Sequence, residues 1–174
     1  KDRETLLHLA CCNRNYDLIK YIVSLKRIDL NALDRNGNNA LYYACCNGSL
    51  EIVQYLISLD KINITHKNDK KETILHRACN SGDLEIVKYL ISLEKFDINA
   101  VDKRHNTPLG NAIYSEKLPL IKYLTTVKGI NLKYTDDDSQ TYLHQAADCD
   151  ENESITIYLL SLNQIPINAK DESG

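Results

Sequence analysis

The chain repeats itself with a period of 34 residues, and this repetition constrains its fold more than any single residue does. Five blocks of the form Thr/Asn-x-Leu-x-x-Ala start at residues 5, 39, 73, 107 and 141. The Leu at the third place and the Ala at the sixth are the same in all five copies. Such a period is typical of arrays in which each copy is one small unit that buries its apolar face against the next.

Two helices are predicted in each copy. The first block predicts a helix of about two turns, because a Thr hydroxyl can cap its first amides while Leu and Ala share one face. A second block repeats in step, since residues 50–59 and 84–93 are identical at all but one position. Its broad apolar surface predicts a helix that packs on two sides. Gly48 and Gly82 separate the two blocks, where a tight turn needs a residue tolerant of positive φ.

A third block in each copy alternates apolar and polar residues and then reaches a polar tip, as in Ile28-Asp29-Leu30-Asn31-Ala32 followed by residues 34–37. The alternation favours a strand and the polar tip favours a turn, so we expect a β-hairpin finger to project from each unit. The fifth copy carries one additional residue between Ala147 and Ser154, which shifts its later blocks by one place.

This arrangement resembles the ankyrin repeat, whose signature is a Thr-Pro-Leu-His-x-Ala helix start, a second helix and a projecting finger. The resemblance covers the whole chain and implies an all-α fold, an ankyrin-repeat solenoid of helix-turn-helix pairs with β-hairpin fingers. It predicts a single domain over residues 1–174, with repeats one to five at about 5–38, 39–72, 73–106, 107–140 and 141–174. Both chain ends then fall inside fingers, so we expect further repeats on one or both sides.

Repeat four departs most from the signature. It alone has the proline, in Thr107-Pro108-Leu109, but it carries Gly110 where the family has His, and Pro119 starts its second helix. A helical Gly is destabilising, so we expect this repeat to be weak. Amide hydrogen exchange should therefore be faster in residues 107–174 than in residues 39–106.

Charge and composition exclude several classes of protein. The formal net charge is −3 and the pI is about 6.0, which gives no overall electrostatic attraction to nucleic acid. No apolar run approaches the roughly 18 residues that a membrane span needs, and Lys1-Asp2-Arg3-Glu4 is unlike a signal peptide. We therefore expect neither nucleic-acid binding nor membrane insertion.

Three copies carry a histidine at the same place: His8, His76 and His144. A metal or catalytic site is one interpretation. Equivalent places in a repeat array, however, form a ladder along the array, whereas the four ligands of zinc must meet at one centre. The resemblance implies instead that each imidazole bonds to backbone and ties neighbouring repeats together.

A second ladder consists of Cys11, Cys45 and Cys79, at a place where the family commonly has a small Ala. We expect these thiols to be buried and to act as small apolar side chains, with Cys12 and Cys46 nearer the surface. Reduced thiols indicate an intracellular, cytoplasmic protein. A redox or metal role for the ladder is the alternative.

No catalytic motif accompanies these ladders. The sequence has no Cys-x-x-Cys pair, glycine-rich phosphate loop, Gly-x-Ser-x-Gly elbow or His-Glu-x-x-His helix. Glu151 and Glu153 fit a solvated turn better than an acid/base pair. We expect no enzymatic activity, no cofactor and no metal.

An asparagine recurs in the third block as Asn31, Asn99 and Asn168. We expect its side chain to hold the finger turn through hydrogen bonds to backbone. By resemblance, the same asparagine is a candidate for side-chain hydroxylation.

The finger tips vary most in charge. Lys70, Lys71, Lys103, Arg104 and His105 make the middle fingers basic, whereas residues 136–138 are all Asp. This contrast is either ordinary solvated surface or a two-toned face that sets the polarity of a bound partner.

By resemblance, the chain is a non-catalytic, monomeric scaffold for protein–protein interaction. It binds a partner protein on its concave face, the surface made by the finger tips and the exposed places of the first helices. The alternative is a docking or substrate-recruiting domain of a larger enzyme or channel. The partner-binding residues implied are Arg35, Asn36, Asn38, Tyr43, Lys70, Glu72, Arg77, Asn80, Lys103, Arg104, Asn106, Tyr114 and Asp137.

Overall fold

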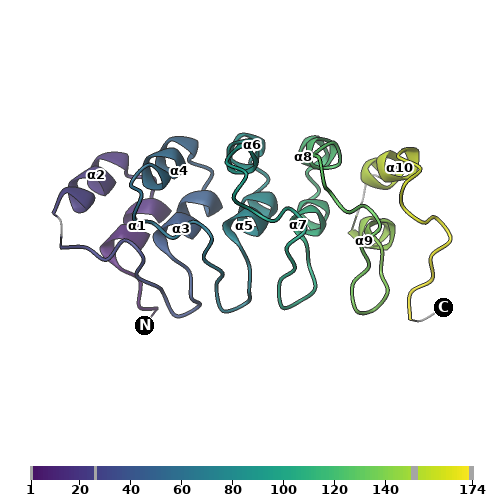
Figure 1. Ribbon diagram of the computed structural model, residues 1–174, viewed down its shortest axis with the longest axis horizontal. Helices are drawn as coiled ribbons and strands as arrows, with labels where there is room; N and C mark the ends of the chain where they lie inside the picture. The colour runs from purple at the N-terminus through teal and green to yellow at the C-terminus, as the bar shows by residue number, and fades with distance from the viewer. Residues whose placement is uncertain (1, 26, 150–152, 173–174) are drawn as a thin grey trace.

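The computed structural model describes residues 2–25, 27–149 and 153–172, and in these ranges the chain forms ten α-helices arranged as five pairs. The first helices of the pairs form one layer and the second helices another, with the fingers projecting beyond the first layer (Figure 1). The predicted all-α solenoid of helix-turn-helix pairs is thus confirmed. In chain order the helices are α1 (Leu6–Cys12), α2 (Tyr16–Ser24), α3 (Ala40–Cys46), α4 (Leu50–Ile57), α5 (Ile74–Ser81), α6 (Leu84–Ser92), α7 (Pro108–Tyr114), α8 (Leu118–Leu124), α9 (Tyr142–Cys149) and α10 (Ser154–Ser161).

The core is a continuous apolar layer built from the same places of successive repeats. Leu7, Leu41, Leu75 and Leu109 of the first helices are each 1% exposed or less. Ile19, Val53, Val87 and Ile121 of the second helices are fully buried. Each repeat therefore completes the core of its neighbour, as expected of a stacked array. None of the described helices is long and apolar enough to cross a membrane.

The first helices begin at the caps that the sequence predicts. The Thr5 and Thr73 hydroxyls accept the backbone N–H of the residue three places on, at 3.4 and 3.3 Å. In both cases that residue is a histidine whose Nδ1 accepts the N–H of the threonine in return, which completes a capping box. Asn39 caps α3 in the same way through its side-chain oxygen, at 3.0 Å from Tyr42 N.

Left-handed residues recur at fixed places in the repeat. Gly48 and Gly82 have φ of 64° and 78° between the helices of a pair, as predicted. At the tip of the first finger, Gly37 has φ of 73°, and a Cβ there would lie 2.7 Å from Asp69 Oδ1, so only glycine fits. After the second helix, Gly129 has φ of 89°. The other described copies turn one place earlier in the repeat, with left-handed residues other than glycine: Asp60, Glu94 and Asn163.

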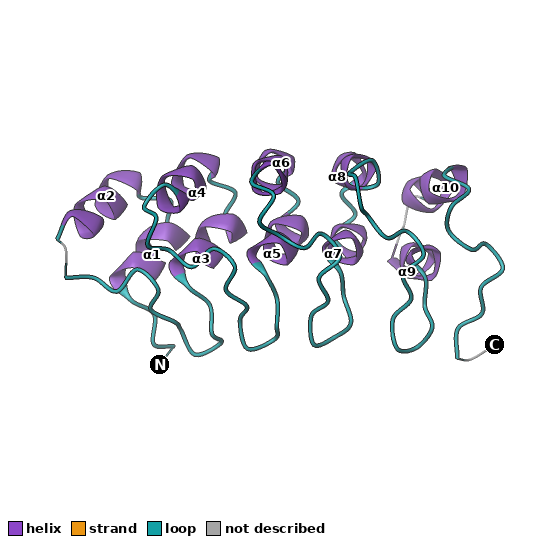
Figure 2. Cartoon of the chain, viewed as in Figure 1, coloured by secondary structure: helices purple, strands orange, loops and turns teal. Residues whose placement is uncertain are grey.

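The fingers differ from the predicted β-hairpins. Within the described ranges there is no strand (Figure 2), and the single strand-type pairing found there is an isolated bridge between Thr135 and Thr141. Each finger is a loop whose base is closed by one backbone bond, such as Asp34 N to Asn38 O at 2.9 Å. In the first finger two of the other tip N–H groups bond a side chain, while Gly37 N bonds Asp34 O within the turn and Arg35 N bonds Asp2 O, which leaves no donors for a strand ladder.

That side chain is a buried Asp or Asn at the base of the finger. In the first finger, Asp34 Oδ1 accepts the N–H groups of Asn36 and Asn38, at 2.7 and 2.8 Å. Burial alone would raise the pKa of Asp34, but these donors and the Tyr43 hydroxyl outweigh it and leave the pKa below its usual value. The same place is held in later fingers by Asn68, Asp102 and Asp136.

The recurring asparagine of the third block forms a clamp between repeats rather than within the finger. Asn99 Nδ2 donates to Gly129 O at 2.8 Å, and Asn99 Oδ1 accepts the N–H of Asn131 at 2.8 Å. Asn31 makes the corresponding pair of bonds to Lys61 and Asn63, both at 2.7 Å. The prediction of side-chain to backbone bonds is correct, but both partners belong to the following repeat.

The clamp occurs at alternate junctions. Thr65 and Lys133 occupy the clamp place in repeats two and four, and neither reaches the next repeat. Junctions one–two and three–four each carry a second tie to a finger-tip carbonyl. His66 Nε2 lies 2.7 Å from Gly37 O, and the Tyr134 hydroxyl donates to His105 O at 2.7 Å. The Asn clamp and the bond to a finger-tip carbonyl therefore follow a two-repeat pattern.

In repeat four, side chains of repeat five occupy the place of the missing histidine. Gly110 leaves the Thr107 hydroxyl without a histidine partner, and the Tyr142 hydroxyl takes that place at 2.7 Å from Thr107 Oγ1. Tyr142 is 1% exposed and is among the largest fully buried side chains of the described residues. The Gln145 side chain fills the remaining space, with Oε1 3.1 Å from where a Cβ of Gly110 would lie. The missing histidine is thus compensated by a larger neighbour.

The extra residue of repeat five lies between α9 and α10, where residues 150–152, including Glu151, are outside the described part of the chain. Glu172 N donates to Asp138 O at 3.1 Å, the bond that Lys103 makes to Lys70 two repeats earlier. The register predicted with the one-residue shift is therefore kept up to Glu172.

Replacing Asn99 with Ala should lower the free energy of unfolding by about 1–2 kcal/mol, because two hydrogen bonds between repeats are lost at about 0.5–1.5 kcal/mol each. Lys133→Ala, at the same place of repeat four, is the matched control and should change it by less than about 0.5 kcal/mol. Urea denaturation measures both. Equal effects of the two substitutions would contradict the clamp.

Restoring the family histidine by Gly110→His should destabilise the protein. Overpacking against Gln145 and Tyr142 costs about 1–3 kcal/mol, which exceeds the at most ~1 kcal/mol gained by removing a helical glycine. Tyr142→Ala copies the arrangement beside His8, where Ala40 holds that place. The double variant should lose less free energy of unfolding than the sum of the losses of the two single variants. Urea denaturation measures all three, and losses that simply add would contradict this account.

Candidate functional site

The histidine ladder is structural. His8 and His76 are 1% and 0% exposed, and each Nε2 lies 3.1 Å from a carbonyl oxygen, that of Asn38 and Asn106 respectively. Because each Nδ1 accepts the threonine N–H, the proton lies on Nε2 and is donated to that carbonyl. Burial lowers the pKa of His76 and so favours the neutral ring. Each bond holds a first helix to the chain segment that enters the next repeat.

His144 keeps the local half of this arrangement. It is half-buried, and its Nδ1 accepts the N–H of Thr141 at 3.1 Å. Across the described residues, no three His, Cys, Asp or Glu side chains come together in a group that could hold a metal ion.

The cysteine ladder is buried as predicted. Cys11, Cys45 and Cys79 are fully buried, and burial raises the pKa of all three thiols, that of Cys11 to about 12. None of the six cysteines, all of which lie in the described part of the chain, forms a disulfide. Cys12 is exposed and Cys46 is half-buried, so the adjacent cysteines do lie nearer the surface. A raised thiol pKa disfavours the nucleophilic thiolate, which weakens the redox interpretation of this ladder.

A hollow of about 470 Å³ lies on the concave face, between α5, α7 and the bases of the fingers that precede them. His76, Asp102 and Asn111 form part of its wall and are not among the predicted residues. The repeat register could have identified Asn111, because it holds the place in repeat four that Arg77 holds in repeat three. Six predicted partner-binding residues meet in this wall: Glu72, Arg77, Asn80, Arg104, Asn106 and Tyr114.

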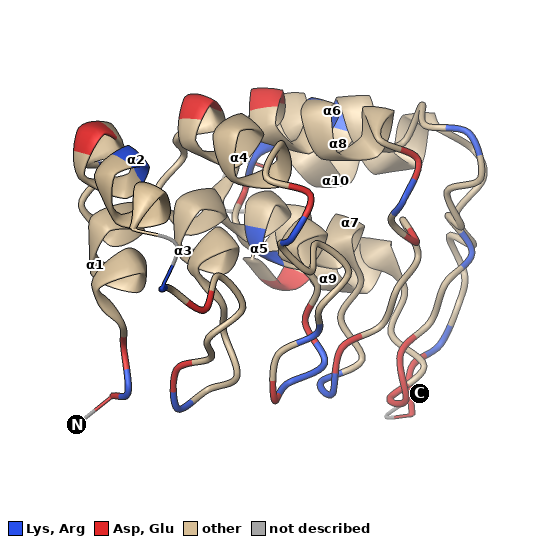
Figure 3. Ribbon diagram, turned by 60° about the vertical axis from the view of Figure 1, so that its left-hand side comes forward, with Lys and Arg blue, Asp and Glu red and all other residues tan. Residues whose placement is uncertain are grey.

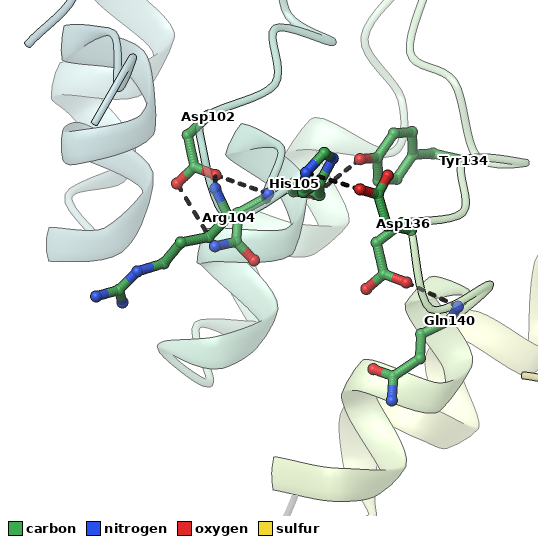
Figure 4. A network of polar contacts seen from close by, with 8 residues as sticks. Asp102, Arg104, His105, Tyr134, Asp136 and Gln140 are labelled. Atoms are coloured by element: carbon green, nitrogen blue, oxygen red, sulfur yellow. Dashed lines mark hydrogen bonds and ion pairs between the residues drawn. The ribbon is translucent and has the colours of Figure 1, made fainter. Parts of the chain in front are cut away.

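Both carboxylates in this wall already have donors. Asp102 Oδ1 accepts two backbone N–H groups of its own finger, at 2.7 and 2.9 Å (Figure 4). Glu72 Oε2 accepts the Asn68 amide at 2.7 Å and the Tyr42 hydroxyl at 3.2 Å. Each carboxylate therefore accepts hydrogen bonds from donors within the protein and forms no ion pair with the arginines of the wall.

The two arginines of the wall are not paired with acids. Arg77 reaches back to repeat two, where it donates to the Cys46 sulfur and lies 5.4 Å from the centre of the Tyr42 ring. Its Nε is buried without a hydrogen-bond partner. Arg104 is exposed, and its guanidinium points away from the Asp102 network (Figure 4). No ion pair of the described residues involves either guanidinium.

Five of the remaining predicted residues are exposed on the finger tips, outside the hollow: Arg35, Asn36, Lys70, Lys103 and Asp137. Two others differ from the exposed position expected of them. Asn38 is 7% exposed, and its side chain bonds Asp34 and Asn68 at 3.0 and 2.9 Å. Tyr43 is half-buried, and its hydroxyl donates to Asp34 at 2.8 Å. Both side chains are committed to the framework of the fingers.

The basic and acidic fingers meet at one junction. Backbone bonds join neighbouring tips elsewhere, for example Asp69 N to Asn36 O at 3.0 Å and Lys103 N to Lys70 O at 2.8 Å. Between the described third and fourth fingers that backbone bond is absent. His105 Nε2 instead lies 2.9 Å from Asp137 Oδ2, beside the Tyr134 bond (Figure 4). Side-chain contacts therefore hold the fingers together where the charge changes sign.

A maleimide probe should label the native protein first at Cys12, because that thiol is exposed, and should label the buried ladder of Cys11, Cys45 and Cys79 only as the protein unfolds. Peptide mapping by mass spectrometry after short exposures, with and without urea, separates the two groups. Labelling of the ladder in the native protein at the rate of Cys12 would contradict its structural role and reopen the redox interpretation.

A profile of the ankyrin-repeat family, described as ankyrin repeats in three copies, matches residues 1–68 and 75–171. A search of curated proteins found no match. Ankyrin repeats generally mediate protein–protein interaction and are typically non-catalytic. The matched residues span nearly the whole chain and coincide with the helix pairs and fingers described above. The chain therefore belongs to the ankyrin-repeat family.

Proposed function

We propose that this protein is a non-catalytic interaction scaffold that binds one partner protein on its concave face, acting as a monomer in the cytoplasm. The observation that carries the proposal is the hollow between α5 and α7, which gathers six of the residues that the family resemblance implies for partner binding. Arg77 and Tyr114 are among them, and these residue types often anchor interfaces.

The framework of the fingers supports a binding role. The tips are held by buried side chains at their bases and by bonds between neighbours, so little backbone freedom remains to be lost when a partner binds. A surface organised before binding loses less conformational entropy and gains affinity from the same contacts. The mechanism is presentation of a preformed surface.

A second candidate function uses the same surface, as a docking or substrate-recruiting domain of a larger enzyme or channel. Exposed apolar side chains on repeat five favour it. Ile157 and Ile167 are 62% and 70% exposed, although Lys122 and the buried Leu132 hold these places in repeat four. Large apolar side chains exposed in this way are suited to contact with further polypeptide.

Charge reversal of both arginines, Arg77→Glu with Arg104→Glu, should abolish capture of the native partner from a lysate of the source organism. The melting temperature should shift by no more than about 4 °C, because few internal contacts are lost. The matched control is Lys95→Glu with Lys128→Glu, at exposed places between the second helix and the finger. Quantitative mass spectrometry compares the proteins captured by the unmodified chain, the arginine variant and the lysine control. A partner retained equally by these three proteins would exclude the concave face as the binding surface.

A further inference from the structure

The hollow on the concave face contains two carboxylates and two guanidiniums, and they differ in how far their hydrogen bonds are satisfied within the protein. Its two carboxylates, Asp102 and Glu72, each accept at least two hydrogen bonds from within the protein. Its two guanidiniums have no acidic partner, and Arg77 Nε has no acceptor. An unpaired buried donor costs free energy, which an incoming acceptor would recover.

An arginine is suited to a carboxylate because its planar group donates two parallel bonds. Arg104 is suited to this role, since it is exposed and its guanidinium points away from the Asp102 network (Figure 4). Asn80, Asn106 and Tyr114 add uncharged polar groups around the same hollow. The volume of about 470 Å³ accommodates one side chain of a partner together with its backbone.

The charge of the concave face then changes sign along the array. The exposed tips of the first three fingers carry more Lys and Arg than acids, and those nearer the C-terminus carry acids (Figure 3). The first helices repeat this order independently, because Arg77 lies in α5 and the exposed Asp148 lies in α9. On the concave face, the finger tips and the first helices thus both change from basic to acidic toward the C-terminus.

We propose, resting on the function proposed above, that the partner presents an extended segment whose charges are segregated. An Asp or Glu of this segment enters the hollow between Arg77 and Arg104, with further acidic residues along the basic tips of Lys70 and Lys103. Its basic residues lie over Asp137 and Asp138 of the fourth finger. Segregated charge fixes the orientation of such a segment, because the reversed placement brings like charges together.

The test uses fluorescein-labelled peptides of about 12 residues, roughly 40 Å when extended, and the whole 174-residue chain. One peptide has a Glu block followed by a Lys block, a second has the blocks in the opposite order, and a third alternates Glu and Lys. All three have the same composition, so their net charge cannot explain a difference. Fluorescence anisotropy at low and physiological salt measures the dissociation constants.

One of the two block peptides should bind about tenfold more tightly than the alternating peptide. Arg104→Glu and Asp138→Lys should each weaken that peptide severalfold, whereas Lys95→Glu should not. Because neither Arg104 nor Asp138 supports the fold through its side-chain charge, thermal unfolding should be unchanged in both variants.

The proposal would be overturned if all three peptides bound with equal affinity, or if Arg104→Glu and Asp138→Lys left the affinity unchanged. The basic and acidic tips would then be ordinary solvated surface. If the concave variants still lose the native partner while the peptides do not discriminate, the scaffold function stands and this partner chemistry fails. Retention of the native partner by those variants would instead overturn the scaffold function itself.

Discussion

The hydrogen bonds of an Asp or Asn at the base of each of the first four fingers, buried in the first three, are the interaction on which the concave face depends. The Asp or Asn side chain accepts N–H groups of the tip, so the loop stands away from the helices without a strand ladder. The same bonds explain the electrostatics of the hollow. Because Asp102 Oδ1 accepts the N–H groups of its own finger, Asp102 forms no ion pair with Arg104, and a wall containing two acids still has guanidiniums outside any ion pair.

The period, the helix pairs and the capping threonines could be predicted because each is a local pattern repeated five times. The bonding partner of Asn99 could not, since its local sequence suits a turn equally well and the bonded backbone lies about one repeat away. The strand prediction for the fingers failed for a related reason. Alternating residues favour a strand only when backbone donors are available to a neighbouring strand, and here side chains and the carbonyls of turns and neighbouring tips accept them.

The binding residues divide in the same way. Exposed tips such as Lys103 could be chosen from the register, because an array keeps its core places constant and varies its surface. Asn38 has the same register place as Glu72 and Asn106, yet its amide is buried between Asp34 and Asn68. The place of a residue in the repeat therefore predicts where it lies along the array, whereas the neighbouring side chains determine whether its own side chain is exposed to solvent. Tyr142 shows the same dependence, because its burial follows from the absence of a side chain at Gly110.

The alternation of the Asn clamp means that successive junctions of the array are held by different bonds. Junctions one–two and three–four each combine a clamp with a bond to a finger-tip carbonyl, so these two contacts recur every 68 residues. Repeats two and three are joined instead by Ser81, which donates to Cys45 O, by Arg77, which donates to Cys46, and by the backbone bond from Lys103 to Lys70. One place in the repeat can therefore stabilise the array in one copy and contribute little in the next.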